Sequence, residues 1–118
     1  MKPKGILKNS TREVTVLYGS TRSAVKIVAR ETDIPGLVVH RRLDAVGQPI
    51  LESWTITHEA SGLAAGFGIS SIQIVRRALE RIAELNIDWT QQNEKVATNA
   101  NAARVRAVLL SVEARKQP

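Results

Sequence analysis

The chain has 118 residues, of which 43% are hydrophobic and 24% are charged, and its formal net charge is +6. This length predicts a single domain, and this composition argues against general disorder. The absence of cysteine excludes disulfides, zinc ribbons and thiol catalysis, and it is typical of a reducing compartment. The apolar runs are far shorter than the ~20 residues of a membrane helix, and residues 9–13 interrupt any signal peptide. We therefore expect a cytoplasmic protein without a membrane segment.

The net charge is concentrated at the N-terminal end. Residues 1–30 contain seven bases and one acid and so carry +6, whereas the other 88 residues contain 10 bases and 10 acids. Solubility alone does not require such asymmetry, so it points to a polyanionic partner. Residues 1–12 combine Pro3, Gly5 and three lysines with few apolar residues. They predict a flexible basic arm, followed by a single α+β domain over residues 13–118.

Alternating apolar residues and turn signals predict an antiparallel sheet after this arm. We expect four strands and a short fifth strand or edge, at residues 13–18, 24–30, 37–43, 50–58 and 63–67. In the second strand, Lys26, Val28 and Arg30 share one face and leave the other face apolar. The first two strands therefore predict a hairpin with one basic side.

After Gly68 the periodicity changes from two to 3.6 residues. Residues 71–86 carry an apolar stripe behind a cap at Ser70 or Ser71, which predicts an amphipathic helix. A second helix is predicted over residues 102–115, and its apolar positions either pack beside the first helix or join a second subunit. The expected fold class is α+β, with an antiparallel sheet of four or five strands packed against one amphipathic helix, plus a C-terminal helix.

Residue types that support catalysis, metal binding or nucleotide binding form no complete motif. His40 and His58 lie on different predicted strands, and an enzyme would use them as an acid–base pair, but partly exposed sheet histidines are the simpler interpretation. No second histidine lies at zinc-binding helical spacing from His58. The glycines of residues 62–68 match neither a P-loop nor a dinucleotide-binding motif, so we interpret them as turn glycines. We assign no catalytic residue, no metal ligand and no cofactor.

The basic side chains therefore carry the functional prediction, because phosphates attract Lys and Arg irrespective of base sequence. Tyr18 is the aromatic residue of the basic region that could stack on a base. Trp54 and Trp89 are instead expected to be buried core or interface anchors. The predicted nucleic-acid contacts belong to the arm, the hairpin and the third strand, and they are Lys2, Lys4, Lys8, Arg12, Arg22, Lys26, Arg30, Arg41 and Arg42.

The sequence favours a small non-catalytic nucleic-acid-binding protein, with DNA ahead of RNA as its partner. The alternative is a protein-interaction or assembly module that forms a homodimer or docks on a partner through its C-terminal helix. Salt-dependent retention on DNA or heparin separates the two functions, because phosphate contacts weaken steeply with salt and apolar docking does not.

Overall fold

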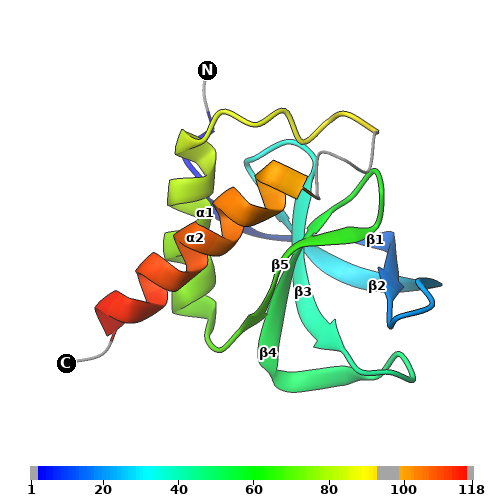
Figure 1. Ribbon diagram of the computed structural model, residues 1–118. Coiled ribbons are helices and arrows are strands. Elements are labelled where there is room, and N and C mark those ends of the chain that lie inside the picture. The colour runs from blue at the N-terminus through cyan, green and yellow to red at the C-terminus, as the bar shows by residue number, and fades with distance from the viewer. Residues whose placement is uncertain (1–2, 93–98, 117–118) are drawn as a thin grey trace.

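The computed structural model describes residues 3–92 and 99–116, which form a curled antiparallel sheet and two helices (Figure 1). Hydrogen-bonded neighbours in the sheet follow the chain order β1-β2-β3-β4-β5. This architecture confirms the predicted α+β class. The elements are β1 (Leu7–Tyr18), β2 (Ser23–Thr32), β3 (Leu37–Leu43), β4 (Pro49–His58), β5 (Leu63–Ile69), α1 (Ile72–Glu84) and α2 (Asn99–Lys116).

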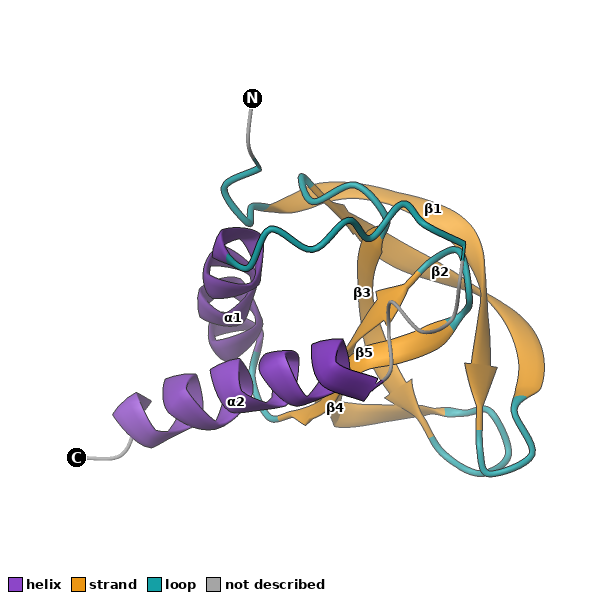
Figure 2. Cartoon of the chain, turned by 45° about the horizontal axis from the view of Figure 1, so that its top comes forward, coloured by secondary structure: helices purple, strands orange, loops and turns teal. Residues whose placement is uncertain are grey.

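The sheet curls so strongly that its two edge strands meet at one end (Figure 2). There the backbone N–H of Leu17 in β1 donates to the carbonyl oxygen of Gly62, before β5, at 2.9 Å. The concave face of the sheet is therefore enclosed by the sheet itself. It holds a small apolar cluster that consists of Val14, Val16, Ala29 and Val38.

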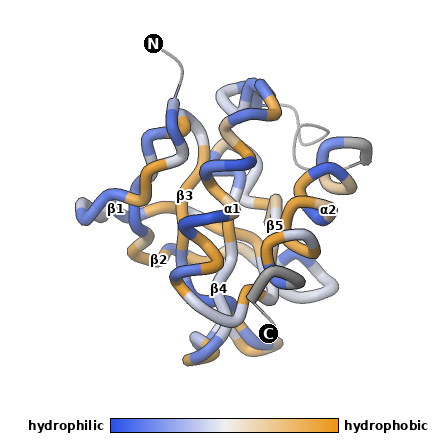
Figure 3. Tube along the Cα trace, turned by 90° about the vertical axis from the view of Figure 1, so that its left-hand side faces the viewer, coloured by the Kyte–Doolittle hydropathy of each residue, from blue (hydrophilic) through white to orange (hydrophobic). Residues whose placement is uncertain are grey.

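Helix α1 packs on the opposite face of the sheet, as the sequence predicted. The Ser71 hydroxyl accepts from the backbone N–H of Ile74 at 3.2 Å, so Ser71 is the N-cap that satisfies one of the free donors of the first turn. Hydrophilic and hydrophobic residues alternate along the helix (Figure 3). Its apolar stripe enters the main core together with Val39 of β3 and Ile56 of β4, and the stripe consists of Ile74, Val75, Ala78, Leu79 and Ile82.

Helix α2 packs against α1 and β5 of its own chain. Val105, Leu109 and Val112 are buried in the main core. Gly66 of β5 permits this approach, because a Cβ there would lie 2.9 Å from Cδ1 of Leu109. A dimer through this helix would therefore have to use other side chains, such as the 61% exposed Leu110. Neither helix in the described part of the chain is long and apolar enough to cross a membrane.

The N-terminal segment belongs to the sheet, which corrects the predicted flexible arm and its boundary at residue 13. Strand β1 begins at Leu7, and the Leu7 side chain is only 5% exposed. The carboxylate of Asp33 accepts from the backbone N–H groups of residues 4, 5 and 6 at 2.9, 2.9 and 2.7 Å. The prediction was wrong because it weighed the small apolar area of this segment and not its backbone pairing. Lys2 lies outside the described residues.

Candidate nucleic-acid interface

The two neighbouring arginines of β3 lie on opposite faces of the sheet, because successive strand residues alternate. Arg41 is opposite Trp54 in the β3–β4 register, and its guanidinium carbon lies 4.6 Å from the centre of the Trp54 ring. Arg42 lies over Phe67 of β5, at 5.1 Å from the ring centre. Each guanidinium is thus positioned by an aromatic ring, as is favourable for a cation over a π-face. The predicted Arg41-Arg42 cluster is in fact two separate cationic positions.

Arg41 belongs to a depression of about 470 Å³ on the outer face of the sheet. We call it the outer groove. Lys26 projects from the same face of β2 as Val28 and Arg30, which agrees with the predicted basic side of the hairpin. Val28 is 67% exposed, so the groove combines cations with accessible apolar surface. The residues that line the groove include Thr11, Val28, Arg30, Arg41, Pro49 and Trp54.

Arg30 is held in place without being neutralised. Its Nε donates to the carbonyl oxygen of Lys8 at 3.0 Å, and its Nη2 donates to Oδ1 of Asn9 at 3.2 Å. Both acceptors are uncharged. Within residues 3–92 and 99–116, no carboxylate lies within 4.0 Å of the cationic atoms of Lys26, Arg30 or Arg41. These three charges are therefore available to an anionic partner, with Glu13 as the acid on the same face of β1.

Arg12 has the opposite environment. Its Nη2 donates to Oε1 of Glu59 at 2.8 Å, and its Nε lies 3.3 Å from Oε2 of Glu31. Two carboxylates thus compensate this guanidinium. Arg12 was predicted to contact nucleic acid, but its ion pairs join β1 to β2 and to the end of β4, so we leave it out of the proposed interface.

The other predicted contacts are distributed over the molecule. Lys8 is exposed on β1, and Lys4 lies in a separate hollow beside Glu80 and Glu84 of α1. Arg22 lies in the β1–β2 turn and lines a second cavity, on the concave face of the sheet. Among the predicted residues that the structure describes, Arg30 and Arg41 line the outer groove together, and Lys26 lies on the same face of β2 as Arg30.

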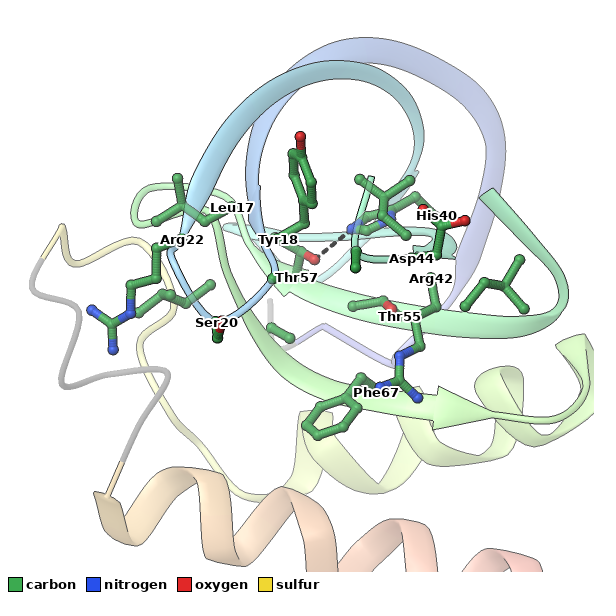
Figure 4. Close-up of a pocket in the computed structure, with 16 residues that line it drawn as sticks. Leu17, Tyr18, Ser20, Arg22, His40, Arg42, Asp44, Thr55, Thr57 and Phe67 are labelled. Carbon is green, nitrogen blue, oxygen red and sulfur yellow. Dashed lines mark hydrogen bonds between the residues drawn. The ribbon is translucent and has the colours of Figure 1, made fainter. Parts of the chain in front are cut away.

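A cavity of about 500 Å³ lies on the concave face of the sheet (Figure 4). We call it the concave cavity. At its floor, Nε2 of His40 lies 2.7 Å from Oγ1 of Thr57, and Nδ1 lies 2.7 Å from the carbonyl oxygen of Arg41. Burial lowers the pKa of His40, against a smaller raising effect of the bond to Arg41. The polar and aromatic side chains of the lining include Tyr18, His40, Arg42, Thr55, Thr57 and Phe67.

The two histidines do not form the pair that an acid–base mechanism would use. His40 is opposite Thr55 in the register and His58 is opposite Leu37, which places the two rings on opposite faces of the sheet. Nδ1 of His58 lies 2.7 Å from Oγ of Ser61, and its Nε2 donates to the carbonyl oxygen of Gln91 at 2.7 Å. Both histidines are buried, at 7% and 0% exposure, so the expectation of partly exposed rings was wrong.

Trp89 is 1% exposed, which confirms its predicted burial, but Trp54 differs from the prediction. Trp54 packs against the core with one part of its ring and lines the outer groove with another. Trp54 was not among the predicted contacts, because Arg41 lies far from it along the chain. The β3–β4 register places Trp54 opposite Arg41, so this register is the feature from which the contact could be predicted.

We expect the protein to lose stability on acidification through His40. The folded-state pKa lies below the ordinary 6.5, so the unfolded chain binds a proton at a higher pH than the folded protein does. The contribution to the free energy of unfolding is therefore complete above pH 6.5 and is lost as the pH falls toward the folded-state pKa. Thermal or urea unfolding between about pH 7 and pH 5 measures this loss. The variant His40→Gln should lose less stability over that range, and an equal loss in both proteins would contradict the assignment.

Within the described parts of the chain, no group of three or more His, Asp or Glu residues could hold a metal ion. Comparison with known proteins gave no further guide, because no family model, no curated protein and no solved structure matches this chain.

Proposed function

We propose that the protein binds nucleic acid without catalysing a reaction, through the outer groove. The observation that carries this proposal is the combination of Arg30 and Arg41, neither compensated by a carboxylate in the described residues, with the partly exposed ring of Trp54. Cationic side chains bind the phosphate backbone, and aromatic and guanidinium planes stack on bases. This proposal includes a cytoplasmic location for the protein.

The geometry of the groove favours a flexible single strand as the ligand. The guanidinium carbon of Arg41 lies over the Trp54 ring, so the guanidinium can offer its outer side to a base and its N–H groups to a phosphate. Lys26 and Arg30 continue the positive charge along β2, and Val28 between them offers apolar contact. A single strand can fit its bases to such a surface, whereas the bases of a duplex are stacked inside.

The test is a binding titration with a single-stranded DNA oligonucleotide, the RNA of the same sequence and the corresponding duplex, each at several salt concentrations. We expect the triple variant Lys26→Gln, Arg30→Gln, Arg41→Gln to bind more weakly at all base sequences. The plot of log affinity against log salt should flatten by up to about 0.7 for each lost contact on a single strand, and so by about 2 in all. Circular dichroism of the triple variant shows whether the fold is retained.

Arg42→Gln is the matched control, because it removes the same charge from the neighbouring residue on the other face of the sheet. It should leave the salt dependence unchanged. Absence of wild-type binding to all three nucleic acids at low salt would eliminate the proposal, and equal effects of the triple variant and Arg42→Gln would eliminate the groove as the site.

A further inference from the structure

Helix α2 carries apolar residues on two opposite faces. One face packs in the main core, where Val105 is fully buried. Ala107 follows two residues later, a rotation of about 200°, and so lies on the opposite side of the helix. Ala103 and Leu110 share that side, at spacings of four and three residues from Ala107. All three are exposed, Leu110 by 61%, and we call them the exposed face of α2.

The spacing of the exposed face is that of a helix–helix contact. Steps of four and three residues repeat every seven residues, as do the positions that interlock in a two-stranded coiled coil. A surface helix needs only one apolar face to pack on its own domain. Helix α2 lies at the surface of the molecule, where it crosses α1 (Figure 1). Its second apolar face is therefore accessible to another helix.

Two opposite charges flank the exposed face on one side. Arg106 and Glu113 are seven residues apart, so they project in nearly the same direction and are separated by about 10 Å along the helix. Neither has an ion pair with another residue that the structure describes. On the other flank, Nη2 of Arg104 donates to the carbonyl oxygen of Leu85 at 3.0 Å. The flank with Arg106 and Glu113 is thus the one that offers its charges to a partner.

The order of these charges fits a second copy of the same helix in antiparallel orientation. A two-fold axis half-way between Arg106 and Glu113 places each of them opposite the other residue of the second copy, which forms two ion pairs. The same axis brings Leu110 of one copy close to Ala107 of the other, so that a large side chain meets a small one. A parallel pair would place identical residues at the same level and would form neither ion pair.

We propose that the chain forms an antiparallel homodimer through the exposed face of α2. Leu110 of each copy packs against Ala107 of the other, and Arg106 of each copy pairs with Glu113 of the other. Ala103 extends the apolar contact at both ends. This contact is only about three helical turns long, so the dimer is of the small, transient class that exchanges with monomer. The proposal does not rest on nucleic-acid binding in the outer groove.

The experiment is sedimentation equilibrium of the full chain between about 10 μM and about 1 mM, a range over which a weak dimer becomes populated. We expect the average mass to rise from that of one chain towards that of two. Leu110→Gln removes the large side chain of the contact and should remain monomeric. Because Leu110 is already 61% exposed, this variant should fold, and circular dichroism checks that it does.

Reversal of the charges tests the antiparallel arrangement. Arg106→Glu and Glu113→Arg each place like charges opposite each other in the homodimer, so each variant alone should associate at least about tenfold more weakly. An equimolar mixture of the two variants restores both ion pairs and should associate as the wild type does. Arg76→Glu makes the same charge change on the exposed side of α1 and should leave the association unchanged.

A wild-type chain that stays monomeric at about 1 mM would overturn the proposal and would leave the exposed face of α2 to a helix of another protein. Undiminished dimerisation of Leu110→Gln would place the interface elsewhere on the molecule and would also overturn it. A mixture of Arg106→Glu and Glu113→Arg that stays monomeric, while the wild type dimerises, would overturn the antiparallel arrangement.

Discussion

Replacement of Trp89 by Ala is expected to lower the free energy of unfolding by about 3–5 kcal/mol, the usual cost of deleting a buried Trp side chain. Trp89 is 1% exposed and belongs to the main core. Its ring centre lies 6.1 Å from that of His58, and it joins the segment after α1 to the sheet. Deletion of the ring leaves a cavity where these elements meet. Urea denaturation monitored by circular dichroism measures the loss.

Trp89→Phe is the matched control for this prediction. The indole Nε1 is buried and has no hydrogen-bond partner among the described residues. Removal of this N–H therefore breaks no observed bond, and Phe retains part of the apolar volume. Trp89→Phe should cost clearly less than Trp89→Ala. A Trp89→Ala variant as stable as the wild type would show that the ring contributes no packing energy.

The parts of the fold that bury side chains could be predicted from the sequence. Strand β3 coincides with the expected residues 37–43, and α1 lies within the expected 71–86, because burial imposes a period of two or 3.6 residues. The first half of β1 could not be predicted. From Lys8 to Glu13 every side chain is exposed, so this stretch is held to β2 by the pairing of residues 11–13 and by the polar contacts of Arg12 and Arg30, and not by side-chain burial. Such pairing leaves no periodic signal.

Only those features of the candidate sites that follow from the alternation of side chains along a strand could be predicted from the sequence. Period two places Arg41 and Arg42 on opposite faces, and it places Lys26 on the same face as Arg30. The partners of the two arginines depend on register. The β3–β4 hairpin keeps one register from Leu37 to Arg41, so the contact with Trp54 follows from counting residues.

The contact between Arg42 and Phe67 does not follow from counting. The register shifts between Arg41 and Leu43, and it shifts twice between β4 and β5. The concave cavity is even harder to predict from the sequence than this contact, because it exists only where the curled sheet brings β1 to β5. Curvature of this kind depends on bulges and on the packing of both faces, which a single strand's pattern does not contain.

Replacement of Gly36, in the turn between β2 and β3, by Ala is expected to destabilise the fold strongly. The φ of Gly36 is +93°, and a Cβ there would lie 2.2 Å from the carbonyl oxygen of Trp89. The backbone of Trp89 cannot move away as a flexible side chain could, because its ring is fixed in the core. The left-handed backbone costs an L-residue about 1–2 kcal/mol and overpacking about 1–3 kcal/mol, so Gly36→Ala should lose roughly 2–5 kcal/mol.

Gly19→Ala separates the two contributions. Gly19 has a φ of +74°, but nothing lies within 4 Å of a Cβ at that position. Its replacement should therefore cost only the backbone part, about 1–2 kcal/mol. Urea midpoints of the two variants, compared with the wild type, measure the difference. Equal destabilisation would mean that the close approach of Gly36 to Trp89 contributes nothing. A larger loss in Gly36→Ala would show that the turn before β3 and the segment after α1 stabilise each other through this backbone contact.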